Sequence, residues 1–212
     1  MMNPLPKVKH YSVKSELNKA IKLDPGLSVL VDRLGYPAAR KRGADFTTLA
    51  RIINSQQLST HAAAAIWSRL EQYCHGSVTP QKFLARTIPQ LGEVGLSKMK
   101  IEYMRGLAES IHSGVFELKS LVALPDHRVI SELVKIRGVG VWSAEIFAMF
   151  ALGRRNFYPA RDLALQVAVH RYAGLEARPD ENTVKNYSER WAPHRSSVAL
   201  LMWKYYGSTT LD

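Results

Sequence analysis

A carboxylate and a pair of glycines are the residues of this sequence whose types and spacing could do chemistry together. Gly138 and Gly140 stand one residue apart between two stretches that carry apolar residues at helical spacing. Glycine permits backbone angles and close approaches that a Cβ obstructs, and the amides that open a helix favour an anion. Asp162 follows Gly140 by 22 residues, which leaves room for one helix and a loop. The pattern thus combines an anion-binding backbone with one carboxylate, a group that can stabilise positive charge or position water.

Each half of this pattern also has a simpler interpretation. A Gly-x-Gly segment can be no more than a tight turn between two helices. Asp162 comes shortly after the helix-breaking Pro159, where a helix would begin, and an acid there is most often an N-cap. The residues alone leave both interpretations open.

The elements that must position these residues are all predicted to be helices. Apolar residues recur at helical spacing, and no alternating strand pattern, internal repeat or low-complexity tract interrupts them. The expected helices are two short ones between Ser12 and Leu34 separated by Pro25-Gly26, then Phe46 to Ser55, Ser59 to about Tyr73, one capped by Ser97, one opened by Pro125-Asp126, Val141 to roughly Leu152, Glu181 to Trp191, and Arg195 to Tyr206. The sequence therefore predicts an all-α fold.

Four ordered stretches resemble the helix-hairpin-helix (HhH-GPD) DNA glycosylase superfamily, and specifically its 3-methyladenine DNA glycosylase II branch. They run from Phe46 to Leu70, Val94 to Gly114, Leu133 to Gly174 and Glu189 to Tyr205. The resemblance implies a single unit over 1–212 with two helical subdomains flanking a cleft. The middle subdomain with the hairpin would span about 46–150, and 1–45 plus 151–212 would form the terminal subdomain. Only 45 residues precede Phe46, too few for the N-terminal β domain of larger members.

The resemblance implies a monofunctional DNA-3-methyladenine glycosylase. Such an enzyme flips an alkylated purine out of duplex DNA and hydrolyses its N-glycosidic bond, which initiates base excision repair. An alkylated purine carries positive charge and leaves readily, so one carboxylate, Asp162, would stabilise the oxocarbenium-like sugar. At about 4 Å and an effective dielectric near 20 that attraction is roughly 4 kcal/mol, or nearly three decades of rate. Trp142 occupies the position of the lysine nucleophile of bifunctional relatives, so no lyase activity is expected.

The same resemblance assigns DNA contacts and a base pocket to particular residues. Trp142 and Trp203 would line the pocket, where an aromatic face attracts a cationic base by about 0.5–2 kcal/mol. Gln57 would fill the gap that the flipped nucleotide leaves. The residues expected to contact DNA are Gln56, Gln57, Leu58 and Ser59 in the minor groove, and Arg137, Gly138, Gly140, Val141 and Ser143 at a phosphate.

Several of these assignments have plainer alternatives or depart from the family pattern. Glutamines at a helix junction are usually surface residues or caps, and a tryptophan usually packs in the core, as expected for Trp67 and Trp191. Ser59 stands where relatives can carry a larger polar side chain, so its contact with the base opposite the lesion would be weak. Arg137 replaces a frequent proline and would add charge near the phosphate, and His194 replaces a frequent aromatic residue.

The composition agrees with a nucleic-acid partner. Twenty-nine Lys and Arg against 18 Asp and Glu give a formal charge of +11 and a pI near 9.8, typical of proteins that bind nucleic acid or anionic membranes, although a merely soluble basic protein has this charge too. No apolar run approaches the roughly 20 residues of a membrane span, and the opening residues 1–14 lack the apolar core of a secretory signal. We expect an intracellular monomer, in the bacterial cytoplasm and nucleoid or in a eukaryotic nucleus, that binds double-stranded DNA containing alkylated bases or abasic sites.

Cysteine and histidine usage argues against a metal centre built from side chains. Cys74 is the only cysteine, which excludes an intramolecular disulfide and a four-cysteine iron–sulfur cluster. The seven histidines show no zinc-ligand spacing, and no cofactor is expected to be required. The resemblance adds a structural Na⁺ or K⁺ at the hairpin, held by the backbone carbonyls of Val134, Ile136 and Val139.

Two groups of basic residues are explained as solvated surfaces without a function. One is a loop with Arg40, Lys41 and Arg42, for which a phosphate contact is the alternative. The other is the helix that carries Lys98, Lys100 and Arg105.

Two other functions fit the same scaffold. The chain could be a non-catalytic binder of abasic or distorted DNA, because a hairpin and a wedge suffice for binding. It could also be a helix-hairpin-helix subunit of a larger nuclease or polymerase assembly, although no partner-type tail is evident. The presence of Asp162 favours the glycosylase.

Overall fold

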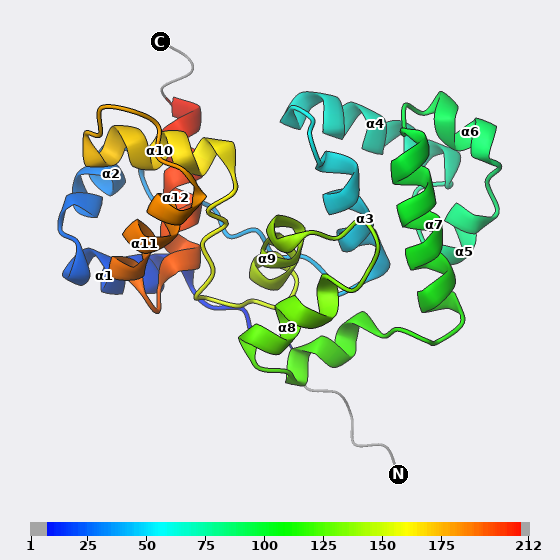
Figure 1. Cartoon of the computed structure of the whole chain (residues 1–212), viewed down its shortest axis with the longest axis horizontal. Coiled ribbons are helices and arrows are strands. Elements are labelled where there is room, and N and C mark those ends of the chain that lie inside the picture. Colours follow the sequence, from blue (N-terminus) through cyan, green and yellow to red (C-terminus); the bar gives the residue numbers. More distant parts are fainter. Residues whose placement is uncertain (1–7, 209–212) are drawn as a thin grey trace. The chain divides into compact units, whose positions relative to one another are not determined.

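The computed structural model describes residues 8–208, and all regular secondary structure in that range is helical (Figure 1), which confirms the predicted all-α fold. Residues 1–7, part of the segment expected to lack a secretory signal, lie outside the described range. Between residues 8 and 208 no helix is both long and apolar enough to cross a bilayer. The elements are α1 (Val13–Leu23), α2 (Gly26–Leu34), α3 (Phe46–Ser55), α4 (Thr60–Tyr73), α5 (Pro80–Leu84), α6 (Ile88–Glu93), α7 (Lys98–His112), the 3-10 helix η1 (Leu118–Ala123), α8 (Asp126–Leu133), α9 (Val141–Phe150), α10 (Leu163–Ala173), α11 (Glu181–Ser188), the 3-10 helix η2 (Glu189–Trp191) and α12 (Arg195–Ser208).

Most of the described α-helices begin where small polar side chains can satisfy the first backbone amides. A Ser, Thr or Asp side chain accepts a hydrogen bond from the amide three residues later at the start of eight helices, and such a cap contributes about 1 kcal/mol. These N-caps are Ser12, Asp45, Ser59, Thr79, Thr87, Ser97, Asp162 and Asp180.

Three predicted helix limits differ from the structure, and one of them is that of the last helix, which was expected to end at Tyr206 and ends at Ser208. The helix expected to reach roughly Leu152 ends at Phe150. The helix expected from Glu181 to Trp191 consists of two elements, because α11 ends at Ser188 and the chain then tightens into the 3-10 turn η2. Helix ends commonly fray or tighten in this way, and periodicity alone does not locate them.

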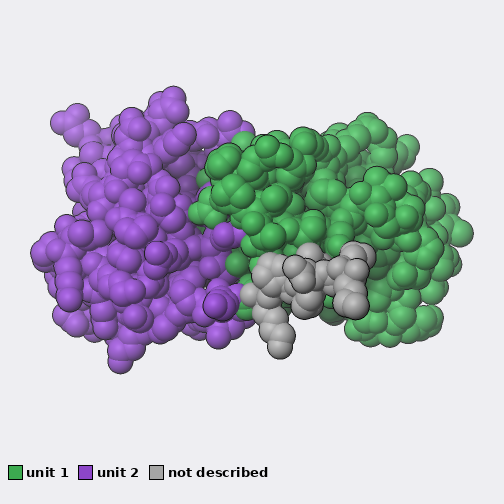
Figure 2. Space-filling view, turned by 90° about the horizontal axis from the view of Figure 1, so that it is seen from below, with its two compact units in different colours: residues 1–8, 42–152 green, residues 9–41, 153–212 purple. Residues whose placement is uncertain are grey.

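The chain forms two compact units, coloured separately in Figure 2. Of the described residues, unit 1 contains residues 8 and 42–152, and unit 2 contains residues 9–41 and 153–208. The hairpin glycines therefore belong to unit 1 and Asp162 belongs to unit 2.

The core of unit 1 is organised around α3. This helix packs against α4, α7 and α9, and α5 and α6 pack on α7 as well. Leu49 and Ile53 on α3 and Phe147 on α9 are fully buried. Trp67 on α4 is only 2% exposed, which confirms its predicted core position.

The single cysteine of the sequence directly follows α4. Cys74 is fully buried in unit 1. Burial raises the pKa of its thiol, and this effect outweighs the opposing influence of Arg86 and Lys82. The thiol therefore stays protonated at neutral pH.

The core of unit 2 is organised around α12, which packs against α1, α2 and α10. Seven consecutive residues of α12, 196–202, are buried, as expected of a helix surrounded by others. The carboxylate of Asp24, just after α1, accepts hydrogen bonds from the Tyr172 hydroxyl at 2.9 Å and the Trp191 indole at 2.8 Å. Trp191 is fully buried, as predicted. The hydrogen bonds of Asp24 join the N-terminal helices of unit 2 to its C-terminal segment.

Candidate functional site

The turn between α8 and α9 in unit 1 forms the predicted hairpin. Gly138 has φ +86°, a conformation that L-residues rarely adopt, and the Val139 amide donates to the Ile136 carbonyl at 2.9 Å. A Cβ at Gly138 would lie 2.3 Å from ring atoms of Tyr103 on α7. The backbone angle and the packing of Tyr103 both require glycine at position 138.

Gly140 differs from Gly138. Its φ of −86° and ψ of 176° are extended values open to any residue, and a Cβ there would meet no atom within 4 Å. No contact within unit 1 requires glycine at position 140, so the close approach of a DNA phosphate to this residue stays a prediction. Gly140 is the N-cap of α9, where no side chain caps the first turn. Open space lies beside this helix start, where the positive end of the helix dipole favours an anion.

The loop between α3 and α4 presents the predicted wedge residues at the surface of unit 1. Gln57, Leu58 and Ser59 are all exposed. Gln57 has φ +55°, an uncommon left-handed conformation for a residue with a side chain. The Ser59 hydroxyl accepts the Ala62 amide at 3.2 Å as the N-cap of α4, so its oxygen already has a structural role.

Gln56 links this loop to the hairpin. Its amide nitrogen donates to the Gly138 carbonyl at 2.8 Å and to the Ser143 hydroxyl at 2.9 Å. Ser143 on α9 is buried, and Gln56 is half-buried. Both residues were predicted to contact DNA, but in this structure their side chains bond to each other within unit 1.

The basic residues of α7 do not form the solvated surface predicted for them. Lys100 donates from Nζ to the backbone carbonyls of Asn54 at 2.7 Å and Gln56 at 2.8 Å, and burial lowers the pKa of its amine. Arg105 donates to the Arg86 carbonyl at 3.0 Å. Lys98 is exposed, as expected for the whole group. Sequence spacing gave no signal for the other two, since their partners lie on other elements.

Asp162 in unit 2 is the N-cap of α10, which confirms the simpler interpretation of this residue without deciding the chemical one. Its Oδ1 accepts the Leu165 amide at 3.2 Å. The same oxygen accepts the indole N–H of Trp203, on α12, at 3.0 Å. A tight turn precedes it, in which the Asp162 amide donates to the Pro159 carbonyl at 2.8 Å. Its half-buried side chain is therefore fixed by the helix start and by a tryptophan predicted for the base pocket.

Arg40 is a residue of this region that sequence reasoning missed. Its guanidinium lies over the Trp203 ring, 5.6 Å from the centroid, rather than belonging only to a solvated loop. The contact brings positive charge to the tryptophan that bonds Asp162. The second predicted pocket residue, Trp142, is half-buried at the start of α9 in unit 1.

Two further side chains of unit 2 are Tyr158, which is buried, and His194, which is partly buried. The Tyr158 hydroxyl has no hydrogen-bond partner among residues 8–208, and its pKa is raised well above the usual value by burial first and then by the charge of Asp162. His194, which stands where relatives frequently have an aromatic residue, has its Nδ1 2.6 Å from a carboxylate oxygen of Glu16 on α1. This imidazole is thus bound to a protein carboxylate.

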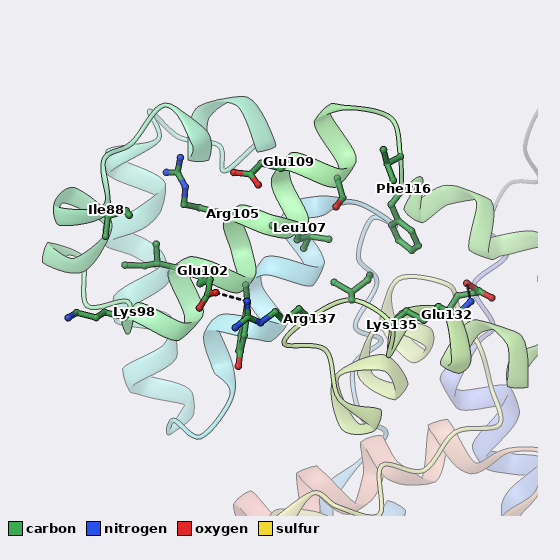
Figure 3. Close-up of a pocket in the computed structure, with 16 residues that line it drawn as sticks. Ile88, Lys98, Glu102, Arg105, Leu107, Glu109, Phe116, Glu132, Lys135 and Arg137 are labelled. Atoms are coloured by element: carbon green, nitrogen blue, oxygen red, sulfur yellow. Dashed lines mark hydrogen bonds and ion pairs between the residues drawn. The ribbon is translucent and has the colours of Figure 1, made fainter.

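A cavity of about 810 Å³ opens in unit 1 along α7, and Tyr103, Arg105 and Ile136 are among the residues that line it (Figure 3). Neither Trp142 nor any residue of unit 2 lines it. At its edge Arg137 forms an ion pair with Glu102, with 2.6 Å between Nη1 and Oε1. Its walls are formed by Ile88, Lys98, Ile101, Glu102, Tyr103, Arg105, Gly106, Leu107, Glu109, Ser110, Val115, Phe116, Glu132, Lys135, Ile136 and Arg137. Over residues 8–208, no three His, Cys, Asp or Glu side chains are grouped so as to hold a metal ion.

A hairpin whose second helix opens uncapped, followed after one helix by an aspartate at the start of another, is the arrangement that the resemblance to helix-hairpin-helix base-excision proteins predicts. Residues 50–194 match the family model described as HhH-GPD superfamily base excision DNA repair protein. The chain therefore belongs to this superfamily.

Solved structures and a sequence relative agree with this membership. A 3-methyladenine DNA glycosylase of Schizosaccharomyces pombe in complex with abasic DNA is similar with a TM-score of 0.82 and 29% identity, over 90% of this chain and 95% of that one. A DNA-3-methyladenine glycosidase of Bacillus halodurans has a TM-score of 0.78 and 31% identity, over 96% of this chain and 95% of that one. YfjP of Bacillus subtilis is 30% identical over 125 residues, which are 59% of this chain and 44% of that protein.

Proposed function

We propose that the protein is a monofunctional DNA-3-methyladenine glycosylase, which removes alkylated purines from duplex DNA and so initiates base excision repair. The observation that carries this proposal is Asp162, a carboxylate fixed at the start of α10 by the Leu165 amide and the Trp203 indole. The names of the similar S. pombe and B. halodurans proteins support the choice of an alkylated purine as substrate.

The chemistry requires little from the protein beyond one well-placed negative charge. A flipped 3-methyladenine is already cationic, so it leaves without strong protonation, and the sugar develops positive charge as the bond breaks. Asp162 would stabilise that sugar and help to position the attacking water. The indole N–H of Trp203, held on the same carboxylate, would fix the direction in which the carboxylate faces.

DNA binding would come from the hairpin and the wedge loop of unit 1. The open space beside Gly140 at the uncapped start of α9 suits a phosphate that accepts backbone N–H bonds. The exposed Gln57 and Leu58 would fill the gap left by the flipped nucleotide. The formal charge of +11 strengthens attraction to the duplex whatever its sequence. The partner would be double-stranded DNA with alkylated bases or abasic sites, bound by one copy of the chain inside the cell.

The product would be an intact strand with an abasic site. A lyase needs an amine that attacks the sugar and forms a Schiff base. Trp142 occupies the position where bifunctional relatives carry that lysine, and an indole cannot form this bond. We therefore propose base removal without strand cleavage.

We also propose that activity needs no cofactor, and that any bound ion at the hairpin is a structural Na⁺ or K⁺. The carbonyls of Val134, Ile136 and Val139 would hold it. The Ile136 carbonyl already accepts the Val139 amide, and its second lone pair can serve an ion. Such an ion would neutralise carbonyl charge where the chain turns.

The test is release of 3-methyladenine or 7-methylguanine from methylated duplex DNA by purified protein in EDTA, without nucleotide. We expect free base in solution and an abasic strand that breaks only after treatment with alkali. Absence of any released base, together with tight binding to abasic DNA, would instead establish a non-catalytic binder. Strand cleavage before alkali treatment would contradict the absence of lyase activity.

A further inference from the structure

The wedge loop holds a residue in a conformation that its own sequence does not favour. Gln57 has φ +55°, which is sparsely populated by residues other than glycine and persists where the surroundings determine it. The turn itself supplies two long backbone bonds, from the Gln56 amide to the Ile53 carbonyl and from the Leu58 amide to the Ser55 carbonyl, both at 3.3 Å. Contacts from the elements packed against the loop must therefore hold Gln57 in this conformation.

Lys100 reaches the loop from α7. Its Nζ lies 2.7 Å from the Asn54 carbonyl, in the last turn of α3, and 2.8 Å from the Gln56 carbonyl. The last carbonyls of a helix have no partner within the helix, and a cation near them is favourable. The Gln56 oxygen belongs to the peptide plane whose nitrogen is that of Gln57. Fixing that oxygen therefore fixes the plane from which the φ of Gln57 is measured.

The side chain of Gln56 holds the same peptide from another direction. Its amide nitrogen bonds the Gly138 carbonyl at 2.8 Å and the Ser143 hydroxyl at 2.9 Å, both in the hairpin. Gln56 is thus fixed by its carbonyl to α7 and by its side chain to the turn between α8 and α9. The next residue in the chain is the exposed Gln57.

We propose that Lys100 and Gln56 are positioning residues that hold the Gln57 wedge in its inserting conformation before DNA binds, in register with the phosphate-binding hairpin. The inference rests on the proposed function, in which Gln57 fills the gap opposite a flipped nucleotide. Neither side chain touches the reacting atoms. Their effect is that the ordering of the loop takes place during folding rather than during binding, which raises affinity for DNA that already has a gap.

The test compares Lys100→Met with Lys98→Met, which removes the same charge from the same helix but at an exposed side chain. For each protein we would measure Kd for an undamaged duplex and for a duplex with one tetrahydrofuran abasic site. The ratio of the Kd for the undamaged duplex to the Kd for the abasic duplex measures the preference for abasic DNA. This ratio reports the wedge alone, because loss of folded protein or of general charge changes both constants alike. We expect Lys100→Met to lower the ratio about tenfold, the equivalent of ~1.4 kcal/mol, and Lys98→Met to leave it unchanged.

Two more variants sharpen the result. Gln56→Met should lower the ratio in the same direction, since it removes both bonds to the hairpin while keeping the length of the side chain. Lys100→Arg should restore part of the ratio, because a guanidinium still donates to carbonyl oxygens. A Lys100→Met protein with the parental ratio would overturn the inference. A parental protein with no preference for the abasic duplex would refute the proposed function itself, so the two failures are distinguishable.

Discussion

The Oδ1 atom of Asp162 accepts hydrogen bonds from the Leu165 amide and the Trp203 indole, so this carboxylate stabilises unit 2 whatever its chemical role. An asparagine at this position keeps an oxygen that can accept both bonds, and asparagine is itself a good N-cap. It differs from the native side chain chiefly in lacking the negative charge. The two roles of Asp162 can therefore be separated by one substitution.

For Asp162→Asn we expect the free energy of unfolding to change by no more than about 1 kcal/mol, because the cap survives. Excision of methylated bases should fall by roughly two to three decades through loss of the charge. Binding to abasic DNA should persist. Thermal unfolding measures the stability, single-turnover kinetics measure excision, and titration with abasic DNA measures binding. A variant that excised bases at the parental rate would leave Asp162 with only its role as a cap.

The two hairpin glycines should respond differently to substitution. Gly138→Ala should destabilise the fold by about 1–3 kcal/mol, since an alanine would be strained at φ +86° and would collide with Tyr103. Gly140→Val should change stability by only about 1 kcal/mol, because its backbone is ordinary and the space beside it is open.

The Gly140→Val protein should nevertheless bind damaged and undamaged duplexes more weakly and to the same extent, because the added side chain would occupy the space proposed for a phosphate. Parallel denaturation and DNA titrations of the two variants test this contrast. Unchanged binding by Gly140→Val would show that the start of α9 is not a phosphate site.

For single residues, the sequence indicated those whose residue type restricts the backbone conformation or the charge. It did not indicate residues whose hydrogen-bond partners lie far away in the sequence. Gly138 and Asp162 could be predicted because glycine and a lone carboxylate restrict the possible roles. Lys100 could not, because its carbonyl partners lie 44 and 46 positions away and a lysine on a helix is usually solvated. The different surroundings of Gly138 and Gly140 could not be predicted, because spacing cannot distinguish a glycine needed for the fold from one that leaves room outside it.

Between elements, an exposed ion pair connects α7 to the hairpin. Arg137, which precedes Gly138, bonds Glu102 at 2.6 Å, and both side chains are more than half exposed. Such pairs contribute little to stability, so Arg137 can exchange its partner readily. In a DNA complex it would leave the carboxylate for a phosphate.

We therefore expect Glu102→Gln to raise affinity for any duplex at low salt, by up to about fivefold, the equivalent of the ~1 kcal/mol at the upper end for exposed pairs. Arg137→Gln should lower affinity and reduce its dependence on salt by about one phosphate contact. Glu132→Gln is the matched control, because Glu132 pairs with Arg128 and Lys135 and its loss changes the net charge equally. Equal gains for Glu102→Gln and Glu132→Gln would mean that only net charge matters.

A second link between elements gives unit 2 a dependence on pH. Glu16 on α1 is only 4% exposed. Burial raises the pKa of this carboxyl, but hydrogen bonds and charge from Lys19 and His194 outweigh it, and the net pKa lies below the ordinary 4.5. A carboxyl with a depressed pKa in the folded state contributes stability above its unfolded pKa and loses it as pH falls through the folded one.

For Glu16→Gln we accordingly expect a lower Tm than the parent at pH 7, and a difference that shrinks once pH falls below about 4.5, the ordinary value of the group. Calorimetry of both proteins from pH 7 to pH 3 measures it. A Tm difference that stays constant over that range would assign the effect to packing rather than to ionisation.

Over the whole molecule, periodicity and caps predicted the helical fold, because both are local properties of the chain. They did not predict which helices meet. In unit 2, the Trp191 indole donates a hydrogen bond to Asp24, 167 positions earlier in the sequence. Such a pairing depends on the tertiary fold, which local periodicity and composition do not show. The likeness to a known superfamily supplied that information, and membership in the superfamily is confirmed.

The burial of Cys74 bears on how the protein resists the methylating agents that damage DNA. Agents that methylate purines also methylate sulfur, and a cysteine reacts with them mainly as the thiolate. Cys74 is fully buried and its pKa is raised, so the native chain offers its one thiol neither exposed nor ionised. Mass spectrometry after treatment with methyl methanesulfonate should find Cys74 unmodified in native protein and methylated in urea, whereas equal modification in both would contradict this. The protein would then keep its thiol intact in a cell whose DNA is being alkylated.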